Sequence, residues 1–113
     1  WSVASREDAL GSPRAAAYLD VGNIIPYGYP EQWIRILGGQ VKRVHLKDFK
    51  VLGIGMGAFV GLLEGDVNWP AVMKALAEVG YSGYLTAEYW PYRHCPETLL
   101  THLSASMDAI LSL

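Results

Sequence analysis

Apolar and polar positions along the chain form blocks that predict strands and helices in alternation. Three short apolar runs each end in charged or polar residues, and a segment with helical spacing follows each run. Such alternation is typical of parallel strands joined by helical crossovers. The first run is continuously apolar, as expected for a parallel strand covered on both faces, whereas Lys42 and Arg43 predict an exposed start to the second. The three runs are 15–20 (AAAYLD), 41–48 (VKRVHLKD) and 83–88 (GYLTAE).

Proline at the start and glycine at the end mark the predicted helices. Residues 30–37 lie between Pro30 and Gly38, residues 69–79 lie between the capping Asn68 and Gly80, and the last helix follows Pro96. A further helical end is expected at 6–10. Apolar residues at helical spacing predict the buried faces. They are Trp33, Ile36 and Leu37 in the first helix, Trp69, Val72, Met73, Leu76 and Val79 in the second, and Leu99, Leu103, Met107, Ile110 and Leu111 in the last.

The segment 49–66 carries five glycines and separates the second strand from the helix at 69–79. It lacks the spacing of a phosphate-binding loop. We expect a mobile loop over the mouth of a site. Asn68, which follows it, is predicted to cap the next helix.

Three strands are fewer than the eight of a TIM barrel, which has about 250 residues. The pattern therefore predicts an α/β fold that is a partial (β/α)8 TIM barrel, namely the last three βα units with parallel strands. We expect residues 1–113 to form a single partial domain. Its two open sheet edges should expose apolar surface, which favours a homo-oligomer or association with the missing barrel half.

Composition restricts the classes of function. Apolar residues make up 51% of the chain, charged residues make up 18%, and the formal net charge is −2. These values exclude a disordered tail and give no electrostatic footprint for nucleic acid or acidic lipid. No apolar run approaches the roughly 20 residues that span a bilayer. Cys95 is the single cysteine, so an internal disulfide is excluded, and a cytoplasmic location is expected.

Residues with useful chemistry lie where the predicted strands end. These residues are Asp20, His45 with Asp48, and Glu88. In parallel α/β folds, functional side chains gather at the carboxyl ends of the strands. Carboxylates and an imidazole without thiolates suit Mn²⁺, Mg²⁺, Co²⁺ or Zn²⁺. Glu88 is the strongest candidate, because a carboxylate near the end of an apolar run is costly unless it is paired or bound to a metal.

Each of these residues also has a purely structural interpretation. Asp20 opens an Asp-x-Gly-Asn sequence, which is good turn chemistry. His45 suits a hydrogen-bonded histidine of the core. Lys47 and Asp48 are expected to form a surface or inter-strand ion pair rather than catalytic groups.

Four segments, in this order, resemble the xylose-isomerase-like TIM barrels, and in particular their sugar phosphate isomerase/epimerase branch. The segments are LDVGN (19–23), RVHLKDF (43–49), EGDVNW (64–69) and YLTAEYW (84–90). The resemblance extends from about Ala15 to the end of the sequence. It implies a structural turn at Gly65, Asp66, Asn68 and Trp69, with Asn68 as the helix cap and Trp69 as an anchor. It implies that Asp20, His45 and Glu88 bind a divalent metal, with Mn²⁺ preferred. It also implies that Glu88 exchanges a proton with a sugar or sugar-phosphate substrate.

The reaction implied by this resemblance is proton transfer beside a sugar carbonyl, through an enediolate that the metal stabilises. Substrate contacts are expected from Asn23 to a hydroxyl, from Lys47 (or Lys50) to a phosphate, and from Arg93 on the loop after the last strand. The family's fourth ligand is a Glu on an earlier strand, which also serves as the second acid/base. Only nineteen residues precede Asp20, and Glu7 is a poor substitute, so we expect this ligand to be missing.

Two alternatives remain open. One is a non-catalytic half-barrel that associates with itself or with a partner. The other is an enzyme similar to type IV AP endonucleases, which place His three residues after the Asp ligand. Asn23 occupies that position here, and an amide does not replace an imidazole ligand, so the endonuclease is disfavoured.

Overall fold

The computed structural model describes residues 11, 12 and 14–113, so the helical end predicted at 6–10 and Glu7 lie outside the described residues. No helix in this described part is long and apolar enough to cross a membrane. The strands are β1 (Ala17–Asp20), β2 (Val41–Leu46), β3 (Asp48–Gly53), β4 (Met56–Val60) and β5 (Leu85–Ala87). The helices are α2 (Val21–Ile24), α3 (Pro30–Leu37), the 3-10 turn η1 (Gly38–Gln40), α4 (Trp69–Glu78) and α5 (Thr98–Leu111).

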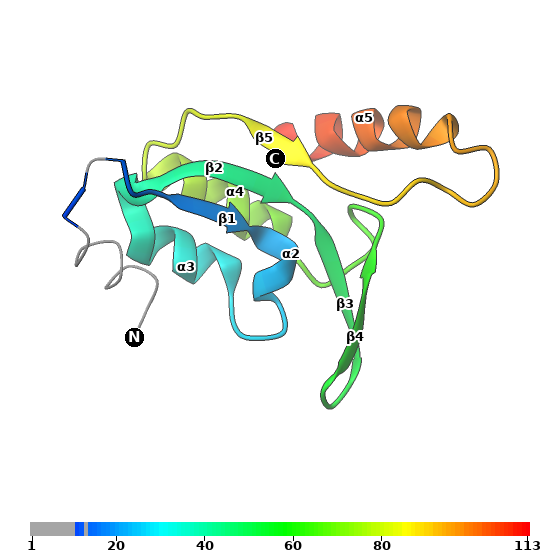
Figure 1. Cartoon of the computed structure of the whole chain (residues 1–113), viewed down its shortest axis with the longest axis horizontal. Helices are drawn as coiled ribbons and strands as arrows, with labels where there is room; N and C mark the ends of the chain where they lie inside the picture. Colours follow the sequence, from blue (N-terminus) through cyan, green and yellow to red (C-terminus); the bar gives the residue numbers. More distant parts are fainter. Residues whose placement is uncertain (1–10, 13) are drawn as a thin grey trace.

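The three predicted strands form one parallel sheet in the order β1-β2-β5. Figure 1 shows them side by side, with α3 and α4 on one side of the sheet. Helices α2 and α3 connect β1 to β2, and α4 lies between β2 and β5 along the chain. The predicted alternation of parallel strands and helices is therefore confirmed. Strands β1 and β5 are the two edges of the sheet within the described residues.

The hydrophobic core lies between the sheet and the pair α3 and α4. Burial alternates along β1, where Ala17 and Leu19 are buried and Tyr18 between them is 55% exposed. The expectation that the first strand is covered on both faces is therefore wrong. Within the described residues, only the face of β1 that points toward the helices is covered. The core residues from the strands and these two helices are Ala17, Leu19, Val41, Val44, Leu46, Ile34, Leu37, Trp69, Val72, Ala75 and Leu76.

Helix α3 has the predicted bounds, but its buried face is rotated from the predicted one. Pro30, Ile34 and Leu37 are buried, Trp33 packs at the margin of the core, and Ile36 is 68% exposed. Ile36 is exposed because it follows the buried Ile34 by two residues, which places it on nearly the opposite side of the helix. Arg35 and Glu78 join these two helices through an ion pair of 2.7 Å, and the guanidinium lowers the pKa of the Glu78 carboxyl.

Helices α4 and α5 confirm most of their predicted faces. Asn68 caps α4, because its side-chain oxygen accepts a hydrogen bond from the Ala71 N–H at 3.1 Å. Leu99 and Ile110 of α5 are buried, whereas Leu111 is exposed at the end of its helix.

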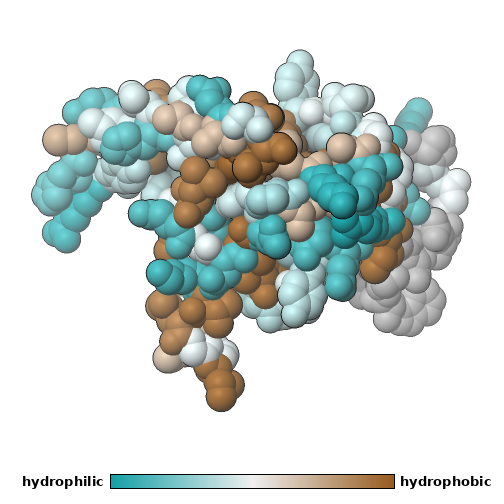
Figure 2. Space-filling model, turned by 180° about the vertical axis from the view of Figure 1, so that it is seen from behind, coloured by the Kyte–Doolittle hydropathy of each residue, from teal (hydrophilic) through white to brown (hydrophobic). Residues whose placement is uncertain are grey.

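The segment predicted as an irregular loop contains an antiparallel hairpin, made of β3 and β4. The rings of Phe49 and Phe59 pack edge to face across it, with centroids 5.2 Å apart. Gly53 and Gly55 have φ of 151° and 69°, which lets the chain reverse at the tip. The hairpin projects from the sheet as an arm, which Figures 1 and 2 show. Its exposed apolar side chains are Val51, Leu52, Ile54 and Met56.

Asp48 is fully buried and holds the base of this hairpin. Its Oδ1 accepts the N–H groups of Phe49 and Val67, and its Oδ2 accepts the Leu63 N–H and the Trp69 indole N–H, all at 2.9–3.2 Å. The predicted surface or inter-strand ion pair between Lys47 and Asp48 is therefore wrong, because backbone and indole donors compensate the Asp48 charge and Lys47 pairs with Asp20 and Glu88. Trp69, which is 4% exposed, is the predicted anchor of the loop.

Gly65 makes this arrangement possible. A Cβ at position 65 would lie 2.1 Å from Asp48 Oδ1 and 2.7 Å from the Phe49 carbonyl oxygen. The glycine leaves the space through which the buried carboxylate reaches its donors.

Replacing Asp48 by Asn should lower the free energy of unfolding by about 2 kcal/mol, because the amide loses the charge and turns a donor toward N–H groups. Chemical denaturation monitored by tryptophan fluorescence measures this change. Asp108→Asn is the matched control, because Asp108 is exposed on α5. Equal stability of the two variants would contradict the structural role of Asp48.

Candidate metal centre

The register of the parallel sheet brings Asp20, His45 and Glu88 together. Asp20 at the end of β1 lies beside His45 of β2. Leu46 of β2 pairs with Ala87 of β5, and the Glu88 N–H donates to the Leu46 carbonyl at 3.0 Å. One ligand atom from each of the three residues lies within 4.8 Å of the others. The structure therefore gathers the three predicted ligands at the carboxyl end of the sheet.

Asp20 has two simultaneous roles in the structure. Its Oδ1 accepts the Asn23 N–H at 3.0 Å and caps the short helix α2. Its Oδ2 lies 3.9 Å from His45 Nδ1, so the second oxygen faces the cluster. The capping and ligand interpretations of Asp20 are therefore compatible. Gly22 permits this turn, because a Cβ there would lie 2.7 Å from the Lys47 carbonyl oxygen.

His45 is oriented by contacts to both ring nitrogens. Its Nδ1 lies 3.2 Å from Glu88 Oε2, and its Nε2 is hydrogen-bonded to the Tyr18 hydroxyl. The His45 side chain is 27% exposed, so it is not a histidine of the closed core. A hydrogen bond to the far nitrogen is the usual means of fixing the ring of a metal-binding histidine. Nδ1 is therefore the nitrogen that faces the two carboxylates.

The sequence reasoning did not include Tyr18 in the site. Tyr18 lies two residues before Asp20 on β1, and residues two apart in a strand share a face of the sheet. Its ring centroid is 4.4 Å from that of His45. The two-residue repeat of a strand, which places Tyr18 on the same face as Asp20, was the sequence signal that could have identified Tyr18.

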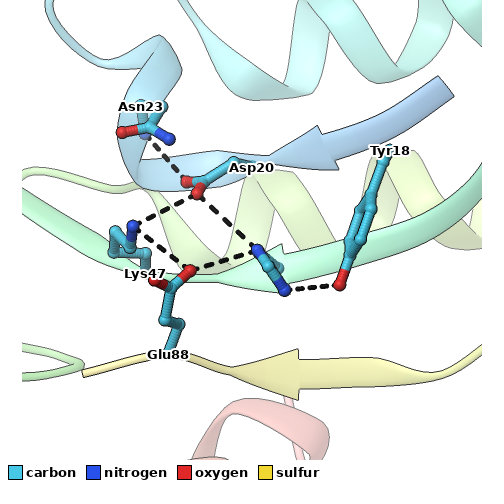
Figure 3. Close-up of polar contacts among 6 residues, drawn as sticks. Tyr18, Asp20, Asn23, Lys47 and Glu88 are labelled. Atoms are coloured by element: carbon cyan, nitrogen blue, oxygen red, sulfur yellow. Dashed lines mark hydrogen bonds and ion pairs between the residues drawn. The ribbon is translucent and has the colours of Figure 1, made fainter. Parts of the chain in front are cut away.

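Lys47 lies at one side of the cluster and contacts both of its carboxylates, as Figure 3 shows. Its Nζ is 3.4 Å from Asp20 Oδ2 and 3.2 Å from Glu88 Oε2. The residue is only 8% exposed. Its ammonium also lies 4.7 Å from the ring centroid of Phe59 and 6.0 Å from that of Trp90, within the range of cation–π contacts.

Of the other two residues predicted to bind substrate, Asn23 lies beside the cluster and Arg93 lies on the segment after β5. Asn23 follows Asp20 on α2, is exposed, and lies beside the cluster in Figure 3. Arg93 is exposed on the segment between β5 and α5. None of the contacts recorded for residues 11, 12 and 14–113 joins Arg93 to Asp20, His45 or Glu88.

The donor set fits a divalent metal ion. Two carboxylates and one imidazole nitrogen suit Mn²⁺, Mg²⁺, Co²⁺ or Zn²⁺, and all three side chains are partly accessible to solvent. The Asp20 and Glu88 oxygens that face His45 Nδ1 are also the oxygens that contact Lys47. The arrangement can therefore hold a cation between two negative charges.

A cavity of about 500 Å³ lies next to the cluster, along β1. Asp20, Tyr18 and Asn23 line it together with Trp33 and Leu37 of α3. Since β1 is an edge of the described sheet, this cavity is a groove beside an unpaired strand.

A family model described as a xylose isomerase-like TIM barrel matches residues 3–110 of the chain. The chain belongs to this family. The predicted fold class, part of a (β/α)8 barrel with parallel strands, is therefore confirmed for this xylose isomerase-like chain. No curated protein matches it.

Solved structures support the same fold. A xylose isomerase domain protein from Planctomyces limnophilus is 27% identical, with a TM-score of 0.78 over 93% of this chain and 39% of that chain. An L-ribulose 3-epimerase is 20% identical, with a TM-score of 0.70 and the same coverages. A D-tagatose 3-epimerase-like protein is 18% identical, with a TM-score of 0.61 over 86% of this chain and 36% of that chain. The chain thus spans less than half the length of these structures.

Replacing Tyr18 by Phe should shift the imidazole nitrogen resonances of His45, because Nε2 loses its partner and the ring loses one of its constraints. Long-range ¹H–¹⁵N NMR of the histidine rings measures this effect. Tyr92→Phe is the matched control, since the Tyr92 hydroxyl contacts His102 Nδ1 at 3.1 Å instead. Unchanged His45 resonances in Tyr18→Phe would contradict the positioning role of Tyr18.

Proposed function

We propose that the protein takes part in the isomerisation or epimerisation of a sugar or sugar phosphate that depends on a divalent metal ion. The observation that carries this proposal is the convergence of Asp20, His45 and Glu88 at the ends of three adjacent parallel strands. Membership of the xylose isomerase-like family supports the reaction class. Similarity to the structures of an L-ribulose 3-epimerase and a D-tagatose 3-epimerase-like protein favours a ketose as the substrate.

Asp20, His45 and Glu88 would hold the ion, and Mn²⁺ is the preferred candidate because the family resemblance implies it. A bound divalent ion supplies positive charge beside the sugar carbonyl, which makes the neighbouring C–H more acidic. Glu88 would then move the proton. Its Oε2 contacts His45 and Lys47, and its side chain is 36% exposed, so the carboxylate is accessible to a substrate. The family's second acid/base, a Glu that also serves as the fourth ligand, is expected from outside the described residues.

The substrate contacts remain predictions of the family resemblance. Asn23 is adjacent to the cluster and can hydrogen-bond a sugar hydroxyl. Arg93 would have to approach from the segment after β5 to meet a phosphate or hydroxyl. Lys47 would have to leave Asp20 and Glu88 to do so, because its ammonium contacts both carboxylates.

A non-catalytic half-barrel is the second candidate, and one observation favours it. The groove runs along the unpaired edge of β1, where a further strand of a barrel and its helix would lie. Tyr18 and Tyr84, exposed by 55% and 82%, carry aromatic surface on the two edge regions. A protein that serves only to complete a barrel in this way would not need to bind a metal.

Replacing Asp20 by Asn separates the two roles of this residue. The amide oxygen can still accept the Asn23 N–H, so the cap of α2 should be kept, whereas the charge that faces His45 and Lys47 is removed. Loss of the charge should weaken Mn²⁺ binding by at least about tenfold, because a ligand carboxylate is replaced by a neutral group. Isothermal titration with Mn²⁺ measures the affinity. Equal affinities of the two proteins would contradict the ligand role, and absent binding in the wild type would favour the half-barrel.

Replacing Glu88 by Gln should abolish metal binding and turnover in the protein assembled with the rest of its barrel. Loss of the proton-transferring group alone should slow exchange by about 10²–10⁴-fold. Incorporation of deuterium from solvent beside the carbonyl of ketoses, beginning with L-ribulose, measures the reaction by ¹H NMR. Glu97→Gln is the control, because Glu97 is exposed before α5. Retention of both properties in Glu88→Gln would refute the assigned site.

A further inference from the structure

Lys47 is a nearly buried lysine whose ammonium bridges the carboxylates of Asp20 and Glu88. A lysine buried to this degree is uncommon unless its charge is compensated. Here the compensation comes from Asp20 at the end of β1 and Glu88 directly after β5, and Lys47 is the only lysine or arginine paired with either of them among the described residues. One ammonium therefore joins β1 to β5 across the end of β2.

The backbone of Lys47 is fixed on both sides. Gly22 of α2 lies against its carbonyl, where a Cβ would approach to 2.7 Å. Asp48, the next residue, is held by its N–H and indole donors. The Lys47 backbone is therefore closely packed on both sides, and the side chain extends from it toward the two carboxylates.

The ammonium uses the same oxygens that a metal ion would use. Oδ2 of Asp20 and Oε2 of Glu88 face both His45 Nδ1 and Lys47 Nζ. An ammonium and a divalent ion repel each other at such separations, so the two cations compete for this pair of carboxylates. The rings of Phe59 and Trp90 lie beside the ammonium in the same position and add favourable contacts to its ion pairs.

We propose that Lys47 is a built-in counter-cation, which holds Asp20 and Glu88 together in the metal-free protein and competes with divalent metal ions for their oxygens. This inference rests on the metal site of the proposed function. It predicts opposite effects on two properties when Lys47 is neutralised. The metal-free protein becomes less stable, because the two carboxylates repel each other, and the metal binds more tightly, because its competitor is gone.

The test compares wild type, Lys47→Met and Lys74→Met, by isothermal titration with Mn²⁺ and by thermal melting with and without Mn²⁺. Lys74→Met removes the same charge from an exposed position on α4. For Lys47→Met we expect a lower melting temperature without metal, a Kd for Mn²⁺ lower by about tenfold or more, and a larger rise in melting temperature on Mn²⁺ addition. Lys74→Met should match the wild type in Mn²⁺ affinity.

Each other outcome is also decisive. If wild type binds Mn²⁺ and Lys47→Met binds it equally or more weakly, the competition is refuted while the metal site stands. If neither protein binds Mn²⁺, the metal site fails and the inference fails with it. If Lys47→Met is unfolded without metal, recovery of its circular dichroism on Mn²⁺ addition supports the inference, and no recovery refutes it.

Discussion

The parallel pairing of β2 with β1 on one side and β5 on the other is the constraint on which the candidate site depends. Parallel strands end at a common edge, so the last side chains of all three strands become neighbours. Asp20 and His45 are register partners, and the hydrogen bond from Glu88 to Leu46 fixes the third residue. A slip of one residue in β1 would turn Asp20 to the helical face of the sheet and remove it from the cluster.

Much of this fold could be predicted from the sequence, because local signals mark it. Pro30 and Gly38 delimit α3, and Asn68 caps α4 as its position before a helical stripe predicts. The hairpin β3–β4 was missed, because its glycines suggested a loop and because its pairing depends on contacts between Phe49 and Phe59 and on Asp48. Glycines can equally form the reversal between two strands, as Gly53 and Gly55 do here.

The candidate ligands could be predicted from the ends of the strands. The groups that compensate the charge of each carboxylate could not be predicted. Asp48 and Asp20 are both acidic residues near strand ends, yet they differ in what surrounds them. Asp48 is satisfied by backbone and indole donors, while one Asp20 oxygen faces Lys47 and His45. The burial of Lys47 results from the approach of Asp20 and Glu88, which are 68 residues apart along the chain. Such long-range convergence leaves no local pattern in the sequence.

The hairpin is held firmly at its base and is free at its tip. Asp48 and Asp66 anchor the base, the latter by accepting the Val51 N–H at 2.7 Å, while Ile54 at the tip is fully exposed. Changes in length or sequence at the tip therefore need not disturb Lys47 or the carboxylates behind it. This separation makes the tip a natural place for evolutionary divergence, or for the insertion of a foreign peptide, because the geometry of the strand ends is set independently of it.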